Sequence, residues 1–406
     1  MRFDVIVVGA GPAGSTAAKA LAEHGVRVLL LDKERFPRDK PCGGGIPARV
    51  LRRYPYIDTK AVIESYTYGG TVYSPSLRFK IDAMKPTPMI AMTLRRKFDA
   101  ELVRLATVAG AVLKEGAQVT GVEVTVQGVW VSTAQGETLE ASVLVAADGV
   151  HSFVATTLGF RKPGAPQGVC VLQEFAVDSL VLDQYFTASR RCLVHARFKA
   201  LPGYGWVFPK KEHLNIGFGA IQPESEAGHG MNLRQCYDEY LAYLREQNLV
   251  PKDLPETAVK GGVTPTRPLE KTYADRVLLV GDAGGFINPL SGEGIYYAMA
   301  SAELAAQTII EGLAKNQFSE EFLSRYETRW RKDFGKDLAL VSMVLERGGL
   351  ENREQVFEIA SQDRKLTDLL IGVITGELGT QKNKWKIVRR YLVASLKFRF
   401  RRKKQP

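Results

Sequence analysis

The chain opens with the apolar and polar pattern of a strand, a helix and a second strand. Residues 2–8 are mostly apolar and β-branched, and the glycine-rich stretch Gly9–Gly14 follows them directly. Apolar positions then recur at helical spacing over residues 16–24, and a second apolar run at residues 26–31 ends at Asp32. Strand, glycine turn, helix, strand and acid, in that order, are the parts of a dinucleotide-binding unit.

The glycines and the acid of this unit each have a physical role. Gly9 permits a tight turn, Gly11 lets a diphosphate approach the backbone, and Gly14 lets the helix pack closely on the strand. The N-terminus of the helix presents N–H groups and a partial positive charge to phosphates. Asp32 follows at the spacing of an acid that binds ribose hydroxyls. This stretch therefore predicts a nucleotide site.

The remaining patterns predict an α/β protein. Helical spacing occurs at residues 48–54, 93–109, 232–247, 294–312 and from 320 onward. Short apolar runs predict strands within residues 66–92, 111–133, 141–147, 169–221 and 276–280, with a hairpin near Gln127-Gly128. We expect a Rossmann-like nucleotide-binding domain, an inserted antiparallel β-sheet domain for the substrate and a helical C-terminal region.

The expected boundaries follow these changes of pattern. The nucleotide-binding domain takes residues 1–65, 93–160 and 260–315, and the β-rich substrate domain takes residues 66–92 and 161–259. Residues 316–377 form the helical C-terminal region, and residues 378–406 form a basic amphipathic tail.

The position of the net charge narrows the possible partners. Of 406 residues, 45% are hydrophobic and 24% are charged, and the formal net charge is +11. Residues 378–406 contain eleven lysines and arginines and no acid, so the rest of the chain has 44 basic and 44 acidic residues. A neutral body with a basic tail predicts a local contact with an anionic partner, not a broad nucleic-acid surface.

The tail has the pattern of an amphipathic helix that binds membranes. One face carries Trp385, Val388, Leu392 and Leu396, and another carries Lys386, Arg390 and Lys397. Basic helices of this kind lie on anionic membranes, where each basic residue contributes about 1 kcal/mol. A tail that binds nucleic acid and a charged tail that is only solvated are the alternatives. The chain enters a core strand without a signal peptide, no apolar stretch is long enough to span a bilayer, and its four cysteines have no metal-ligand spacing. We therefore expect a cytoplasmic protein, peripheral on an anionic membrane.

Three further motifs specify the nucleotide. One apolar run ends in Asp148-Gly149, another ends in Gly281-Asp282, and Arg95 begins a helix. Together with the glycine turn, they resemble the FAD-dependent oxidoreductases of the hydroxylase-like fold over nearly the whole chain. The resemblance implies that Asp282 contacts the ribityl and diphosphate groups of FAD, that Asp148-Gly149 lies between nucleotide and nicotinamide, and that the isoalloxazine lies beside a helix start. The remaining implied FAD contacts are Ala13, Lys33, Arg95, Val119, Gly294 and Ile295.

The loop Pro41-Cys42-Gly43-Gly44-Gly45 resembles a different branch of these flavoenzymes. Hydroxylases have another sequence here, whereas a Pro-Cys-Gly-Gly loop is similar to the geranylgeranyl reductase family, which saturates isoprenoid double bonds. The resemblance places Cys42, Gly43 and Gly45 near the flavin or the substrate double bond. A thiol there either delivers a proton or only fills space as a small hydrophobe.

A second resemblance to this family lies in residues 202–209. Tyr204, Trp206 and Phe208 alternate, so on a strand they share one face and form an apolar wall suited to a polyprenyl chain. An aromatic core stripe is the structural alternative. Flavin-dependent halogenases have a similar Trp-x-Trp box, but no lysine site for their chemistry is evident here. Gly348-Gly349 resembles a late Gly-Gly element of the reductases whose role the sequence does not reveal.

These observations predict an FAD-dependent reductase of a geranylgeranyl or other polyprenyl group. We expect the proton source to be Cys42, Tyr204 or a water. The expected electron donor is NADPH or reduced ferredoxin; no second glycine fingerprint for NADPH is evident, which leaves ferredoxin or another reduced carrier open. The substrate remains open among geranylgeranyl diphosphate, an archaeal-type lipid, a chlorophyll and a quinone tail. A flavin monooxygenase or halogenase is the alternative enzyme, and a flavin-containing carrier or sensor of prenyl lipids is the non-enzymatic alternative.

Overall fold

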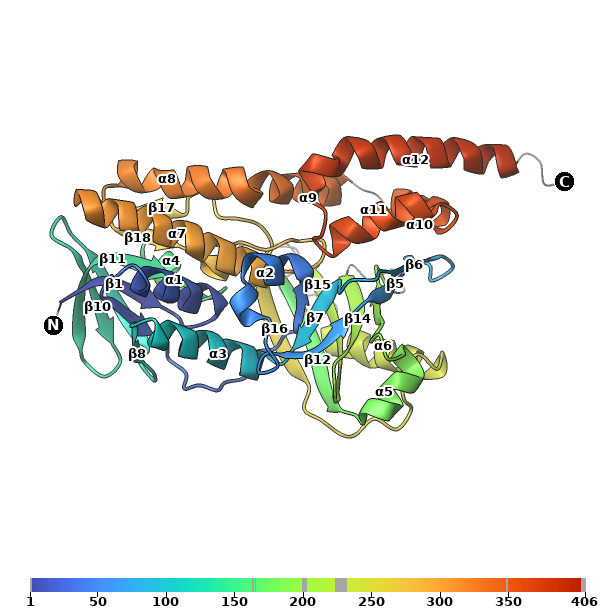
Figure 1. Ribbon diagram of the computed structural model, residues 1–406, viewed down its shortest axis with the longest axis horizontal. Helices are drawn as coiled ribbons and strands as arrows, with labels where there is room; N and C mark the ends of the chain where they lie inside the picture. Colours follow the sequence, from blue (N-terminus) through green and yellow to red (C-terminus); the bar gives the residue numbers. More distant parts are fainter. Residues whose placement is uncertain are drawn as a thin grey trace. The chain divides into compact units, whose positions relative to one another are not determined.

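The chain folds into two compact units, each built on its own sheet. A computed structural model describes residues 2–162, 164, 166–198, 203–222, 232–347 and 350–402, with elements labelled in Figure 1. The first unit comprises Met1–Lys40, Arg95–Gln167 and Thr264–Ala339, and the second comprises Pro41–Leu94, Gly168–Val263 and Leu340–Pro406. Residue 202 of the aromatic box, Gly348-Gly349 and residues 403–406 of the basic tail lie outside the described residues.

The first unit contains a sheet of eight strands over its described residues, in the order β17-β18-β11-β1-β2-β8, with β10 on β11 and β9 on β10. Strands β18, β11, β1, β2 and β8 run parallel. The strands are β1 (Arg2–Val8), β2 (Val28–Leu31), β8 (Val112–Lys114), β9 (Val119–Val124), β10 (Val129–Thr133), β11 (Thr138–Ala146), β17 (Tyr273–Ala274) and β18 (Val277–Leu279).

Both faces of this sheet are buried, which explains its continuous apolar strands. Val5 and Val7 of β1 belong to one core, and Ile6 and Val8 belong to the other, as the two-residue period of a strand requires. The first core contains residues of α1 (Pro12–Ala22), α3 (Arg95–Val108), α7 (Ile295–Lys315) and α8 (Glu320–Trp330). The second contains residues of β9, β10 and α4 (Phe153–Thr157). Short helices η3 (Gly281–Gly284) and η4 (Arg331–Gly335) precede α7 and α9 (Lys336–Arg347).

The second unit contains a sheet whose described strands follow the order β16-β12-β15-β14-β13-β5-β6, and a smaller sheet β3-β7-β4. The larger sheet consists of β5 (Gly69–Tyr73), β6 (Lys80–Met84), β12 (Gln167–Ala176), β13 (Cys192–His195), β14 (Gly203–Pro209), β15 (His213–Gln222) and β16 (Lys260–Pro265). The smaller consists of β3 (Gly45–Pro47), β4 (Ile63–Thr67) and β7 (Ile90–Thr93). The larger sheet is mixed, because β13 pairs parallel with β5 while β13–β14, β14–β15 and β5–β6 are antiparallel.

Helices cover the larger sheet through two separate cores. One core includes residues of α5 (Ser179–Phe186) and α6 (Leu233–Glu246). The other includes residues of α10 (Leu350–Ser361), α11 (Arg364–Ile374) and α12 (Thr380–Arg402). The short helices α2 (Ala48–Arg53) and η1 (Pro55–Ile57) complete the unit. Among the described residues, no helix combines the length and the apolar character needed to cross a membrane.

The α/β fold class is confirmed, with a parallel nucleotide-binding sheet, a β-rich insertion and C-terminal helices. The parallel β5–β13 pair corrects the expected all-antiparallel insertion. The units also divide the chain differently from the expected boundaries. Residues 41–65 group with the second unit because β3 pairs with β7, and the chain from Leu340 joins the same unit because α10–α12 pack on it.

Candidate active site

The glycine turn of the first unit forms a tight cradle at the start of α1. Gly9 has a φ of +97°, and a Cβ at this position would lie 2.3 Å from the Ala147 carbonyl oxygen. A Cβ at Gly14 would lie 1.7 Å from the Gly9 carbonyl oxygen. Gly11, the N-cap of α1, has no side chain that could accept from the first N–H groups of the helix, which leaves this helix start suited to an anion.

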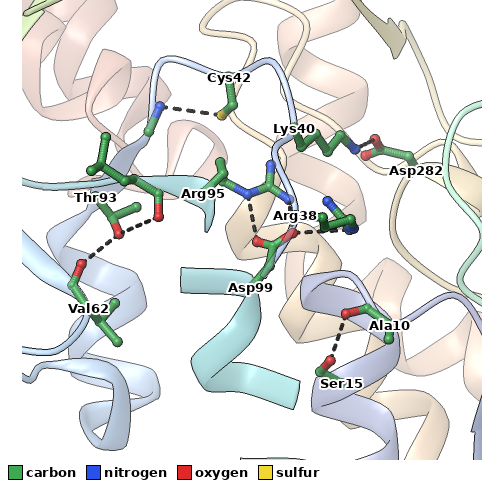
Figure 2. Close-up of polar contacts among 12 residues, drawn as sticks. Ala10, Ser15, Arg38, Lys40, Cys42, Val62, Thr93, Arg95, Asp99 and Asp282 are labelled. Carbon is green, nitrogen blue, oxygen red and sulfur yellow. Dashed lines mark hydrogen bonds and ion pairs between the residues drawn. The ribbon is translucent and has the colours of Figure 1, made fainter. Parts of the chain in front are cut away.

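Asp32 braces this turn from the end of β2. One carboxylate oxygen accepts a hydrogen bond of 2.7 Å from the Ala10 N–H, and the other accepts one of 2.8 Å from the Glu34 N–H. Ser15 Oγ donates to the Ala10 carbonyl oxygen from the first turn of α1 (Figure 2). A carboxylate has about four acceptor sites. Asp32 therefore holds the backbone of the turn and retains acceptor capacity for ribose hydroxyls.

Two arginines converge on one buried carboxylate near the turn. Arg95 at the start of α3 donates to Asp99 through two N–H groups, at 2.7 Å and 2.8 Å. Arg38 contacts the same carboxylate at 3.1 Å, as Figure 2 shows. A Cβ at Gly11 would lie 3.5 Å from Arg38 Nη2, so this guanidinium faces the glycine turn. Two positive charges against one negative charge leave a surplus that suits a diphosphate.

Asp148 and Asp282 follow β11 and β18, two neighbouring parallel strands. Asp282 forms an ion pair of 3.4 Å with Lys40 (Figure 2), and Arg161 donates to its carbonyl oxygen at 3.0 Å. Burial raises the pKa of Asp148, although hydrogen bonds from Ser152 and the Val154 N–H oppose the shift. Asp148 Oδ1 is buried and accepts no hydrogen bond from the described residues. An unsatisfied acceptor of this kind fits a hydrogen-bonding group of a bound cofactor.

The start of α7 lies next to Asp282. A Cβ at Gly294 would lie 3.6 Å from Asp282 Oδ1, and Ile295 is the first residue of the helix. No side chain caps the helix from Gly294, but Glu293 accepts a 2.6 Å hydrogen bond from the Tyr296 N–H. One N–H group of this helix N-terminus is therefore satisfied within the protein.

The other implied cofactor residues of the first unit lie in different surroundings. Ala13 packs against Gly281, because a Cβ there would lie 2.9 Å from Ala13 Cβ, so the glycine turn and the Gly-Asp motif are adjacent. Lys33 is exposed directly after Asp32. The Val119 side chain is 7% exposed and packs in the second core of the sheet, so only its backbone is suited to contact a cofactor.

In the second unit, the Cys42 loop, defined as Pro41–Gly44, contacts the aromatic row of Tyr204, Trp206 and Phe208. A Cβ at Gly43 would lie 2.9 Å from the Phe208 ring and 3.1 Å from Trp206 Nε1. The Gly44 N–H donates to Cys42 Sγ at 3.4 Å. Figure 2 draws this bond as a dashed line to the sulfur of Cys42. Gly45 follows in β3 and also faces the Phe208 ring. The thiol segment and the aromatic wall, predicted from separate motifs, thus meet within one unit.

The aromatic row occupies one face of β14. The ring centroids are 5.6 Å apart between Tyr204 and Trp206 and 6.4 Å apart between Trp206 and Phe208. The opposite face packs on α6, since a Cβ at Gly205 would lie 2.4 Å from the Tyr240 ring. The face of β14 that carries Gly205 therefore packs on the core with α6, and the aromatic row lies on the other face.

Tyr204 is a weaker acid here than an ordinary tyrosine. Burial raises the pKa of its phenol, and the neighbouring Cys170 and Cys42 thiols raise it further. The phenol is therefore less ready to release its proton than an ordinary tyrosine.

The features of the first unit fit FAD: a cradle without Cβ atoms, two arginines near it and an unsatisfied Asp148 oxygen. A family described as FAD binding domain matches residues 2–340. Digeranylgeranylglycerophospholipid reductase 1 of Methanopyrus kandleri is 33% identical over 390 residues, which cover 91% of this chain and 97% of that protein. The chain belongs to the geranylgeranyl reductase family. It is an FAD-dependent oxidoreductase.

Solved structures show the same fold. A geranylgeranyl bacteriochlorophyll reductase-like protein from Thermoplasma acidophilum superposes with a TM-score of 0.77 at 22% identity, covering 94% of this chain and 98% of that chain. A flavin-dependent brominase superposes with a TM-score of 0.73 at 19% identity, covering 99% of this chain and 100% of that chain. The fold is therefore shared with a reductase-like protein and with a halogenating enzyme.

The motifs of the family did not reveal four side chains at these sites. Arg38 and Arg161 come from segments without a recognisable pattern, and their partners lie far away in the sequence. Lys210 and Asn215 flank the aromatic box, yet their burial depends on how β14 and β15 pair. The one available signal was a lysine directly after the box, at Pro209-Lys210.

Proposed function

We propose that this protein saturates carbon–carbon double bonds in the geranylgeranyl chains of a glycerophospholipid, with bound FAD as the redox cofactor. The observation that carries the proposal is the contact between the Cys42 loop and the aromatic row, which puts a thiol beside an apolar wall. The name of the Methanopyrus relative supports this substrate class. A long prenyl chain is apolar, and a row of large rings would bury it favourably.

The cofactor would be held by the first unit. The uncapped start of α1, Arg38 and Arg95 would bind the diphosphate, and Asp32 would accept from the ribose. Asp148 and Asp282 would face the central part of the cofactor. Exposed Lys33 and the Val119 backbone would contact its nucleotide end.

Reduction of an isolated alkene needs a hydride at one carbon and a proton at the other. Reduced FAD supplies the hydride when bound. Cys42 would donate the proton to the second carbon, and the Gly44 N–H, which already points to the sulfur, would stabilise the thiolate that remains. The thiolate would regain its proton from solvent. Tyr204, Trp206 and Phe208 would hold the prenyl chain and exclude water.

The electrons would come from NADPH or reduced ferredoxin. Anaerobic addition of each donor to the FAD-loaded protein distinguishes them, because only a competent donor bleaches the flavin absorbance at a rate that supports turnover.

We also propose that α12 binds an anionic membrane, where such lipids reside. Its outward apolar stripe includes Trp385, 74% exposed, and Phe400, 67% exposed. The opposite side is docked, since Ala394 is 4% exposed in a core with α10 and α11. Arg390, assigned to the basic face from the sequence, instead binds Asp363 of the same unit at 2.8 Å and 2.6 Å.

The charges beside the apolar stripe indicate which kind of surface α12 binds. The exposed basic residues of α12 flank or interrupt the apolar stripe; they are Lys382, Lys386, Arg389, Lys397 and Arg399. A surface that is both apolar and cationic suits anionic lipid headgroups over an apolar boundary.

Vesicle sedimentation tests the membrane proposal. The protein should sediment with phosphatidylglycerol vesicles and much less with phosphatidylcholine vesicles, and W385A/L392A/F400A should lose most of this binding. Val126→Ala is the matched control, since Val126 is 83% exposed in a hairpin of the first unit. Equal binding to both vesicle types, or self-association through the stripe without lipid binding, contradicts the proposal.

A substrate panel tests the reductase proposal. Dithionite-reduced protein is incubated without oxygen with digeranylgeranylglycerophospholipid, geranylgeranyl diphosphate, a geranylgeranylated chlorophyll or a polyprenyl quinone. Mass spectrometry should find saturated bonds most rapidly in the phospholipid. A product that forms only with oxygen and contains oxygen or halogen would instead support the monooxygenase or halogenase alternative.

A further inference from the structure

A cluster of buried polar side chains lies behind the contact between the Cys42 loop and the aromatic row. Asn215 of β15 is fully buried, and Lys210, directly after β14, is 1% exposed. Polar groups are costly to bury unless they hydrogen-bond, so the partners of these side chains indicate what the cluster holds.

Asn215 connects the wall to the loop. Its side-chain oxygen accepts a 2.7 Å hydrogen bond from Trp206 Nε1. Its amide nitrogen donates to the Cys42 carbonyl oxygen at 3.4 Å and to Glu174 Oε2 at 3.0 Å. One side chain thus contacts both the central ring of the aromatic row and the residue that carries the thiol.

Lys210 and Glu174 complete the cluster from the other side of the loop. Lys210 Nζ donates to Glu174 Oε2 at 2.6 Å. A Cβ at Gly44 would lie 3.0 Å from the same Nζ, so the ammonium lies against the backbone of the Cys42 loop. Glu174 Oε2 therefore receives hydrogen bonds from both Lys210 and Asn215, which joins the three residues into one network.

We propose that Asn215, Glu174 and Lys210 are positioning residues that hold the Cys42 loop in one fixed position against Trp206. Their effect on catalysis rests on the proposed reductase function; their effect on the loop does not. The ion pair joins a buried lysine to a half-buried glutamate, and such a pair adds little net stability compared with apolar packing, which favours a positioning role over a purely stabilising one. A proton donor must lie at the correct distance from the alkene, and misplacement by about 1 Å can lower a rate by about 100-fold.

Alkylation of Cys42 tests the loop directly and needs no reductase activity. The FAD-loaded protein is treated with iodoacetamide, and mass spectrometry follows the Cys42 peptide over time. Asn215→Leu keeps the side-chain volume and removes all three hydrogen bonds, so Cys42 should react about tenfold faster than in the wild type. Asn215→Asp keeps an acceptor for Trp206 and loses the donors, and it should also react faster.

Tyr240→Phe is the matched control. It removes a buried 2.8 Å hydrogen bond to His195 on the opposite face of the same sheet and leaves every hydrogen bond of Asn215, Glu174 and Lys210 in place. It should leave Cys42 alkylation and turnover unchanged even if it lowers thermal stability. A general loosening of the unit would instead accelerate alkylation in all three variants and would contradict a specific positioning role.

Turnover gives the second measurement. Asn215→Leu should lower kcat for lipid reduction by about 10- to 100-fold with a smaller change in KM, because the chain still binds the aromatic row while the thiol is displaced. Wild-type alkylation rates and kinetics in folded Asn215→Leu and Asn215→Asp would overturn the proposal. If the wild type reduces no prenyl lipid but the alkylation difference is found, the positioning inference stands and the proposed function fails.

Discussion

Cys42 is the residue whose removal separates chemistry from cofactor binding. The FAD-binding features proposed above belong mainly to the first unit, so Cys42→Ala should retain FAD at wild-type stoichiometry. Loss of a positioned proton donor should lower the reduction rate by about 10²- to 10⁴-fold. Flavin absorbance measures the stoichiometry, and mass spectrometry of the lipid measures the rate.

Cys236→Ala is the control for this substitution, since Cys236 is buried in α6 in the core that contains α5. It should leave the rate unchanged. Full activity of Cys42→Ala would assign the proton to a water or to Tyr204.

His195 should make the second unit sensitive to acid. It is fully buried, stacks on Tyr73 at 4.5 Å and contacts the Tyr240 hydroxyl. Burial lowers the pKa of His195 from 6.5 to about 3. Between pH 6.5 and pH 3 the unfolded chain therefore binds a proton at His195 that the folded chain does not bind. The stabilising contribution is therefore complete above pH 6.5 and decreases as the pH falls toward 3.

Denaturant unfolding at pH 7.5 and pH 4.5 checks this expectation. The wild type should lose about 3 kcal/mol more than His195→Phe, which keeps an aromatic ring and cannot titrate. Burial raises the pKa of the neighbouring Tyr73, Tyr240 and Tyr243. These phenols therefore stay protonated at both pH values and do not contribute to the difference. Equal losses in both proteins would mean that His195 is protonated in the folded state.

At the residue scale, the role of a side chain could be predicted from the sequence when its partners lie in the same motif. The roles of Gly9, Gly14 and Asp32 follow from local backbone geometry, which a short sequence specifies. Arg38 and its partner Asp99 are 61 positions apart in the sequence, a separation over which a sequence has no local signal. Val119 was implied by resemblance alone, and its side chain lies in the core.

At the scale of elements, the pairing of β14 with β15 places Trp206 opposite Gly217, whose missing side chain leaves space for the indole ring. A Cβ at Gly217 would lie 2.0 Å from the Trp206 ring, whereas a Cβ at Gly219 would have no neighbour closer than 3.3 Å. Gly217→Ala should therefore displace the ring, destabilise the protein by about 1–3 kcal/mol and weaken binding of the prenyl chain. Gly219→Ala should have smaller effects on both.

Thermal unfolding and lipid-binding titrations of the two variants make the comparison. Equal behaviour of Gly217→Ala and Gly219→Ala would show that Trp206 can move without cost, and the aromatic row would then not be a rigid wall.

Most elements were predictable because their periodicity is strong. The predicted strand at residues 2–8 is β1, and the predicted helix at residues 232–247 is α6 with its flanking caps. Helix α5 was assigned to strands because Ser179–Phe186 is a short apolar run without helical spacing. Its N-cap, Asp178, accepts from the Leu180 N–H and was the local signal for a helix start.

At the scale of the whole molecule, the two units are each assembled from three chain segments. The sequence indicated a discontinuous nucleotide fold, because its strands are separated by long β-rich stretches. It predicted residues 41–65 in the nucleotide-binding domain, whereas they group with the second unit, because β3 pairs with β7 across more than 40 positions of the chain. The segment with Cys42 consequently lies in the same unit as the aromatic row.

In the proposed reaction, the first unit would bind the cofactor and the second would bind the lipid. The first unit carries the cradle, the arginines and the acids that fit FAD. The second carries the thiol loop, the apolar wall and the helix proposed to meet the membrane. A reductase of membrane lipids needs all of these parts, and the central claim is that they serve one reaction.

Anaerobic reoxidation of the flavin tests that claim most directly. The FAD-loaded protein is photoreduced and mixed with vesicles that contain digeranylgeranylglycerophospholipid, and flavin absorbance is followed while the lipid is analysed by mass spectrometry. The account predicts that the absorbance returns without oxygen and that one double bond is saturated for each flavin reoxidised. Flavin that stays reduced until oxygen is admitted, with the lipid unchanged, would contradict it.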